Sequence, residues 1–119
     1  PIGGMFPAPH GAVCAALLPH VMDVNIRALR QRAPGGDALA RYVDVARILT
    51  GSTSATAEDG VAWVRNLTRN LGIEPLRQYG LKAEHFPELV GKAAKASSMK
   101  ANPIPLTPDE LRDALTSAW

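Results

Sequence analysis

Histidine is the side chain in this sequence best suited to bind a metal ion or move a proton near neutral pH. His10 stands within Pro9-His10-Gly11, in a stretch rich in glycine and proline, and an apolar run follows it directly. The other two histidines are His20 and His85. A metal site needs three or four donor groups, and an acid–base site needs a partner that orients the imidazole. Because the nearest carboxylate in the sequence is that of Asp23, His10 either has no catalytic role or shares one with residues outside these 119.

The remaining candidates have ordinary structural interpretations. His85 is expected near a helix start and exposed, and Gly3-Gly4 is expected to be a turn because no strand precedes it, as a phosphate loop would require. Cys14 is the only cysteine, so no disulfide can form within the chain. Its place in the apolar run predicts a small buried side chain and not a reactive thiol. The sequence has no metal-binding cysteine pattern, nucleotide-binding glycine loop or HExxH motif.

Composition limits the class of protein further. With 46% hydrophobic and 20% charged residues over 119 positions, the chain has the composition of one globular domain. A net charge of +2 is too small to indicate a nucleic-acid or anionic-membrane partner. The densest basic group, Arg27, Arg30 and Arg32, is interpreted as the solvated end of a helix. The apolar run after His10 is interrupted by Pro19 and is predicted to be too short to span a membrane.

Hydrophobic residues recur at helical spacing throughout, and strand-like alternation is absent. Helices are predicted over residues 11–30, 37–50, 56–71, 84–97 and 107–118. Pro19 should kink or split the first, because proline removes an amide donor and crowds the carbonyl four residues back. The predicted buried stripes are Val13, Leu17, His20 or Val21, Val24 and Ala28; Leu39, Val43, Ala46 and Leu49; Val61, Val64, Leu67 and Leu71; Phe86, Leu89, Val90, Ala93 and Ala94; and Leu111, Ala114, Leu115 and Ala118. The fold class is therefore all-α, a bundle or array of about five helices.

Capping signals set several of the predicted helix ends. Thr107-Pro108-Asp109-Glu110 is the clearest, with a capping threonine, proline at the first helical position and a glutamate that completes a capping box. Thr56 and Asp59 form a weaker version of the same box. Asp37 is predicted to cap the second helix, and Gly51 and Gly72 to end the second and third.

Segments at both ends of the chain match a known pattern. Gly3 fits the glycine of a segment reading H-x-x-x-H-x-x-G, Pro9-His10-Gly11 fits a following P-H-G, and Leu18-Pro19-His20-Val21 fits an L-P-x-V that ends an apolar helix. The stretch from Asn102 to Leu111 is similar, more loosely, to the closing part of the same pattern. With these segments the sequence resembles the C-terminal helical domain of the iron-containing (group III) alcohol dehydrogenase family.

The resemblance implies a site that these residues only partly contain. It makes residues 1–119 a single all-helical domain whose partner, an N-terminal α/β domain that binds NAD or NADP, lies outside this sequence. The family's metal is iron(II), sometimes zinc, held by one aspartate and three histidines, and His10 would be the last of these ligands. His20 falls on the variable position of L-P-x-V and takes no ligand role. No catalytic or cofactor-binding residue is assigned.

The implied function is oxidation of an alcohol or reduction of a carbonyl by metal-assisted hydride transfer, with the chain alone inactive and metal-free. The implied partners are a small alcohol, aldehyde or ketone, the N-terminal domain and a second copy of the chain, in the cytoplasm and without nucleic acid or membrane. Two alternatives remain: a stand-alone helical interaction module without catalysis, and a related carbonyl reductase similar to maleylacetate reductases. A ligand role requires His10 to lie at the surface or in a cleft. Removing a cofactor domain should also uncover apolar surface, so the isolated chain is expected to self-associate.

Overall fold

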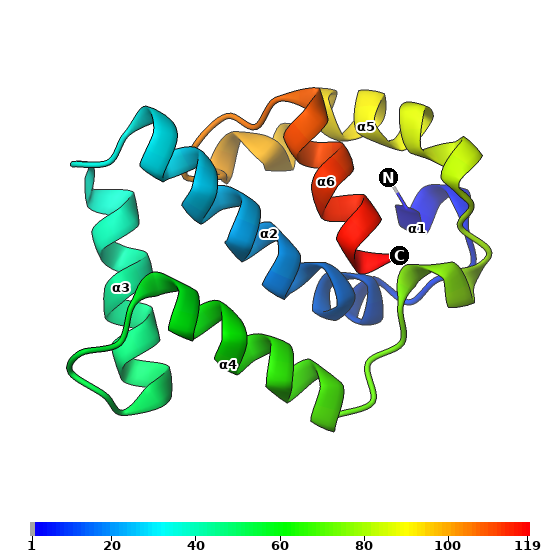
Figure 1. Cartoon of the computed structure of the whole chain (residues 1–119). Helices are drawn as coiled ribbons and strands as arrows, with labels where there is room; N and C mark the ends of the chain where they lie inside the picture. Colours follow the sequence, from blue (N-terminus) through cyan, green and yellow to red (C-terminus); the bar gives the residue numbers. More distant parts are fainter. Residues whose placement is uncertain (1) are drawn as a thin grey trace.

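The computed structural model describes residues 2–119, and within that range it consists of helices and connecting segments without a strand (Figure 1). The all-α prediction is confirmed. The α-helices are α1 (Ile2–Met5), α2 (His10–Arg32), α3 (Asp37–Thr50), α4 (Ala57–Asn70), α5 (Phe86–Lys95) and α6 (Pro108–Ala118). Short 3-10 helices lie between them: η1 (Leu76–Tyr79), η2 (Ala83–His85) and η3 (Ser97–Ala101). The predicted helix over residues 84–97 is therefore α5 with a 3-10 turn on each side.

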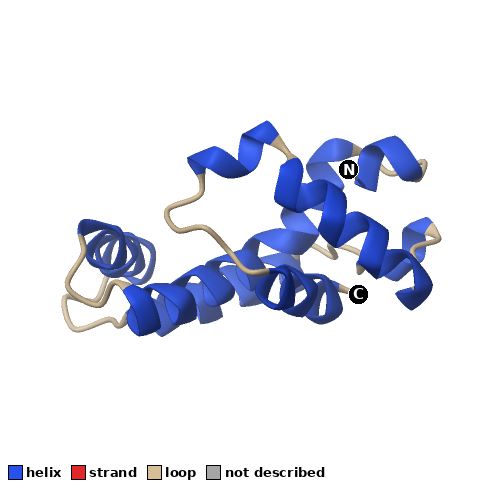
Figure 2. Cartoon of the chain, turned by 90° about the horizontal axis from the view of Figure 1, so that it is seen from above, coloured by secondary structure: helices blue, strands red, loops and turns tan. Residues whose placement is uncertain are grey.

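Helix α2 runs through the middle of the molecule and contacts two separate groups of helices (Figures 1 and 2). Its first half places Val13 and Ala16 in a core shared with α1, η1, α5 and α6. Its second half packs Met22 and Ile26 against α4, with partly buried residues of α3 beside them. The domain is elongated as a result, measuring 41 × 32 × 20 Å. The helical period of the sequence thus produced one long helix whose two halves contribute to different hydrophobic clusters.

Of the two predicted effects of Pro19, a split of this helix is wrong, because α2 runs through Pro19 as one helix of 23 residues. Pro19 is fully buried, and packing on both sides holds the helix in register despite the missing amide donor. Because α2 is one helix of 23 residues, the prediction that this apolar segment is too short to span a membrane is also wrong. By length and composition alone α2 could cross a bilayer, but half of its apolar window is buried inside the fold, which makes this weak evidence for insertion.

Two predicted capping boxes are present. The Thr56 hydroxyl accepts a hydrogen bond from the Asp59 amide at 3.3 Å, and the Asp59 carboxylate accepts one from the Thr56 amide at 2.8 Å. Thr107 and Glu110 make the same pair at 3.2 and 2.9 Å. Each box satisfies two amides that the first turn leaves free. Asp37 does not cap α3: Gly36 holds the capping position, and Asp37 lies in the first turn.

The three arginines at the end of α2 are exposed, as predicted, but each forms an ion pair. Arg27 pairs with Asp23 and Asp113, Arg30 with Glu58, and Arg32 with Glu110. Arg32 also donates to the Pro105 carbonyl at 2.8 Å. Its hydrogen bond to Glu110 is the main reason that the pKa of this carboxyl lies below its ordinary value. The basic group therefore connects the end of α2 to the starts of α4 and α6.

A buried amide pair fixes the segment before α6. Asn25 is 2% exposed and donates to the Tyr42 hydroxyl at 3.0 Å and to the Asn102 side-chain oxygen at 3.1 Å. Asn102 donates back to the Asn25 oxygen at 2.8 Å and to the Ile104 carbonyl at 2.6 Å. Residues 77 positions apart are thereby held together by a closed polar network inside the core.

Some predicted core positions lie at the surface. Leu67 is 40% exposed and Leu71 66% exposed, although both continue the α4 stripe of Val61 and Val64. Leu67 lies near the end of α4 and Leu71 directly follows this helix, and both side chains remain open to solvent. Ala94 on α5 is exposed as well, whereas Leu89 and Val90 are buried as predicted.

Candidate metal-ligand face

The segment that precedes His10 is short and internally bonded. The Phe6 amide donates to the Ile2 carbonyl at 2.9 Å, and the Ala8 amide donates to the Phe6 carbonyl at 2.8 Å. Pro9 then takes an extended conformation, with φ of −60° and ψ of 132°, and α2 begins at the next residue. The predicted turn at Gly3-Gly4 is wrong, since both residues lie within α1. A helical turn and not a glycine turn therefore leads into this segment.

His10 is the first residue of α2, and its side chain is exposed. The predicted surface position is thus confirmed, and the imidazole is not part of the core. Val13 and Ala16, on the next turns of α2, are buried in the core with α5 and α6. Their burial fixes the backbone that carries the imidazole, while the ring itself remains exposed.

Cys14 lies one turn further along the same side of the helix. Its sulfur is 3.5 Å from Nε2 of His10, and the thiol is exposed. The prediction that Cys14 is buried is therefore wrong. Residues at positions i and i+4 share a helix face, so the exposure of His10 already indicated the exposure of Cys14. Leu18, another four residues on, is 49% exposed.

The other two histidines have separate environments. His20 is half-buried, and burial is the main reason that its pKa lies below the ordinary value; the charge of Arg65 adds to this effect and that of Asp23 opposes it. Nδ1 of His85 accepts a hydrogen bond from the Lys82 amide at 2.9 Å. His85 lies beside the start of α5, as predicted, but it is half-buried and not exposed, because its ring packs edge-on against Phe6 at 4.9 Å.

Over residues 2–119, no cluster of three or more histidine, cysteine or acidic side chains could hold a metal ion. His10 with its neighbouring thiol fits one corner of a coordination sphere, because the imidazole is exposed and is carried on a supported helix. The remaining donors of a full site would have to come from elsewhere.

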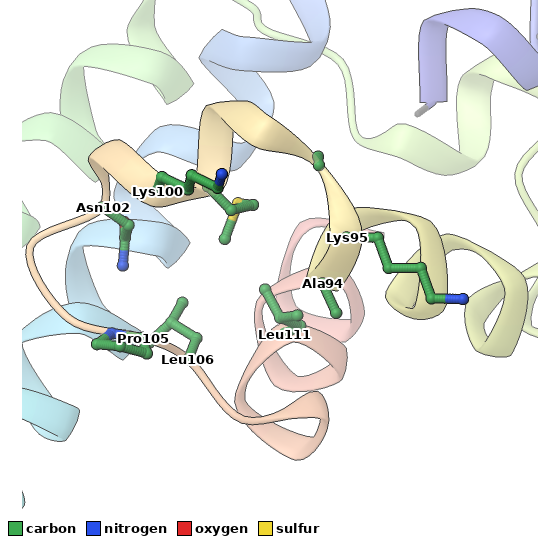
Figure 3. A pocket seen from close by; sticks show the side chains of 9 residues that line it. Ala94, Lys95, Lys100, Asn102, Pro105, Leu106 and Leu111 are labelled. Carbon is green, nitrogen blue, oxygen red and sulfur yellow. The ribbon is translucent and has the colours of Figure 1, made fainter.

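A hollow of about 270 Å³ lies between η3, the segment after it and the start of α6 (Figure 3). Leu106, Leu111 and Asn102 line it, and Lys95 extends away from the other lining residues in the figure. Among the described residues that line this hollow, none is a histidine, a cysteine or an acidic residue. The hollow therefore has no donor set for a metal ion.

The described residues form a helical domain with an exposed histidine at the first residue of its longest helix. Comparison with known families gives the class. The whole chain, residues 1–119, matches the model for the Fe-containing alcohol dehydrogenase family, C-terminal. The chain belongs to this family.

Individual relatives agree with that assignment. The chain is 32% identical over 108 residues to a 1,3-propanediol dehydrogenase of Klebsiella pneumoniae, covering 86% of this chain and 26% of that protein. It is 30% identical to the lactaldehyde reductase of Escherichia coli K12, covering 100% of this chain and 30% of the relative. It is 36% identical to alcohol dehydrogenase 4 of Schizosaccharomyces pombe, covering 98% of this chain and 26% of that relative. The chain thus spans between a quarter and a third of the length of these relatives. No solved structure matches it significantly.

Proposed function

We propose that this chain is the C-terminal, metal-binding part of an iron-containing, NAD(P)-dependent alcohol dehydrogenase, in which His10 is a metal ligand. The observation that carries the proposal is the exposed imidazole at the first residue of α2, within the Pro9-His10-Gly11 segment. The family match over all 119 residues supports it. The same match favours an enzyme over a stand-alone interaction module.

His10 would hold the metal through a ring nitrogen, and the buried side of α2 would keep that nitrogen in place. Bound iron(II), with zinc as the alternative, would supply Lewis-acid polarisation of a substrate oxygen, and a nicotinamide cofactor would take up or give hydride. The names of two relatives, a propanediol dehydrogenase and a lactaldehyde reductase, fit small alcohols and carbonyls as substrates here. Oxidation of an alcohol and reduction of a carbonyl are the two directions of one reaction.

The rest of the same polypeptide is the proposed occupant of the exposed side of α2. Leu18 follows His10 and Cys14 on this side, and α4 lies antiparallel beside α2, with Leu67 and Leu71 exposed on its last turns (Figure 1). The relatives are three to four times as long as the matched region, so a large part of each lies outside it. An adjoining cofactor domain would cover these leucines and bring the missing donors to His10. We place the enzyme in the cytoplasm, as a homo-oligomer.

Two experiments test this proposal. The coding sequence before Pro1 is expected to end in two histidines spaced as H-x-x-x-H and to contain a glycine-rich nucleotide-binding region further back. The protein made from the complete coding sequence is expected to bind iron and to oxidise small alcohols with NAD or NADP. His10→Ala should lower iron affinity by about 10- to 100-fold or more, whereas the control His20→Gln should not.

Folding of the His10→Ala chain separates a ligand from a structural residue. Because the imidazole is exposed, the helical circular dichroism and the urea midpoint of the 119-residue chain should not change. A large loss of stability would make His10 a packing residue. An upstream sequence without donor histidines or a nucleotide-binding region would contradict the assignment of a dehydrogenase.

A further inference from the structure

A partly enclosed apolar cavity of about 190 Å³ lies between α1, α2, α5 and α6. Each of these helices contributes a side chain to its wall: Ile2, Leu17, Leu89 and Leu115. Protein interiors are packed so closely that few voids exceed the size of a water molecule. An apolar cavity of about 150 Å³ takes up benzene or xenon. The cavity in this domain therefore has room for one large apolar side chain.

The chemistry of the wall favours an apolar occupant. Among the described residues that line the cavity, Asn102 alone has a polar side chain. Its amide nitrogen already donates to the Asn25 side-chain oxygen and to the Ile104 carbonyl, at 2.8 and 2.6 Å. An ordered water needs two to four polar partners. Because both N–H groups of Asn102 are used, a polar occupant would lose more hydrogen bonds on leaving water than it gains here.

The described chain begins at the wall of this cavity. Ile2 is the first residue of α1, is 7% exposed and packs in one cluster with Leu111 and Leu115. Any residues that precede Pro1 in a longer polypeptide are covalently joined to this wall. Four residues reach at most about 13–14 Å, and a residue before proline favours extended backbone. The stretch directly before Pro1 is therefore within reach of the cavity.

From this placement we propose that an apolar side chain among the four residues directly before Pro1 fills the cavity in the complete polypeptide. The inference rests on the proposed function, which places a cofactor domain and further metal ligands before Pro1. The relatives are three to four times as long as the matched region. In the expected H-x-x-x-H segment, these four positions are the three spacer residues and the second histidine. The buried side chain would fix the adjacent histidines against α2, α5 and α6, as a positioning residue.

Benzene is the probe for an open cavity, with titration calorimetry as the measurement. The 119-residue chain should bind benzene with a saturable heat, because its cavity is larger than one known to accept this molecule. The complete polypeptide should give no such heat, because its own side chain occupies the space. Benzene binding of equal strength by both proteins would overturn the proposal, since the cavity would then be open to small molecules.

Ala93→Leu adds a large side chain to the wall and distinguishes the two proteins by stability. In the 119-residue chain this substitution should abolish the benzene heat and raise the urea midpoint. In the complete polypeptide it should lower the urea midpoint, because the added atoms meet an occupied space. The control Ala62→Leu lies on the exposed side of α4 and should leave both midpoints nearly unchanged. A rise in both proteins would contradict the proposal.

The upstream residue is identified by replacing each apolar residue among the four before Pro1 with alanine in the complete polypeptide. One replacement should lower the urea midpoint and create benzene binding, as removal of a buried side chain leaves a cavity. If none does so, or if the benzene heat of the 119-residue chain vanishes as that chain self-associates, the occupant is not this segment. These readouts need neither metal nor cofactor. Iron binding with an open cavity would refute only this inference, whereas a filled cavity without upstream donor histidines would refute only the dehydrogenase.

Discussion

Gly60 on α4 lies against Ala46 on α3, and this contact gives a sharp test of the packing. A Cβ added at Gly60 would lie 2.9 Å from the Ala46 Cβ and 3.1 Å from its Cα. Carbon atoms in good contact are about 3.5–4.0 Å apart. Ala46 is fully buried, and its Cα is backbone, so neither atom can rotate away. Gly60→Ala must therefore push α4 from α3 by roughly half an ångström.

The expected cost follows from two opposing effects. Alanine is better than glycine in a helix interior by about 1 kcal/mol, whereas overpacking of a well-packed core costs about 1–3 kcal/mol. The displacement also loosens the contacts of Val61 and Val64, which share the packed side of α4. Gly60→Ala should therefore lower the free energy of unfolding by about 1 kcal/mol, with a fall in Tm of about 3–6 °C for a chain of this size.

Gly91 on α5 provides the matched control. It is exposed, and an added Cβ would meet no heavy atom within 4 Å. Gly91→Ala should raise the free energy of unfolding by about 0.5–1 kcal/mol through helix propensity alone. Urea unfolding followed by circular dichroism measures both variants. A Gly60→Ala protein as stable as Gly91→Ala would refute the close contact between α3 and α4.

Three further perturbations have defined outcomes. Asn102→Ala leaves the side-chain oxygen of Asn25 without the donor from Asn102 and should lower the free energy of unfolding by about 1–3 kcal/mol in urea titrations; an unchanged midpoint would mean that water replaces the amide. The pKa of His20 is lower in the folded chain, so the unfolded chain binds the extra proton and stability should fall as pH drops below about 6.5. His20→Gln should flatten the pH dependence of the free energy of unfolding in this range. An unaltered slope would mean that other titratable groups cause this pH dependence. The isolated chain should self-associate through its exposed leucines, and Leu18→Ser with Leu71→Ser should reduce the sedimentation coefficient at high concentration; a parent chain that stays monomeric would contradict this.

Local signals predicted the helix ends well. Thr56 with Asp59 and Thr107 with Glu110 form the boxes that their spacing indicates, because capping needs only neighbouring residues. Gly51 ends α3 with φ of 72°, a conformation in the left-handed region that suits glycine. By contrast, nothing local indicates that Pro19 is packed from both sides, and this packing keeps α2 whole.

Contacts between helices were harder to predict from the sequence than the helix ends. Leu67 and Leu71 continue a correct apolar stripe, but periodicity gives the face of a helix and not the length over which a neighbour covers it. For the candidate site, the P-H-G segment located His10, and its exposure agrees with that assignment. Cys14 was misassigned because apolar neighbours outweighed its four-residue spacing from His10, the signal that would have placed it correctly.

The packed and the exposed residues of α2 should tolerate substitution differently. Met22 and Ile26 are enclosed by neighbouring helices, so most replacements there reduce stability. The side chains of His10, Cys14 and Leu18 contribute little to stability, because they are exposed. Substitution of Leu18 should therefore leave the domain folded, whereas substitution of Met22 or Ile26 should destabilise it.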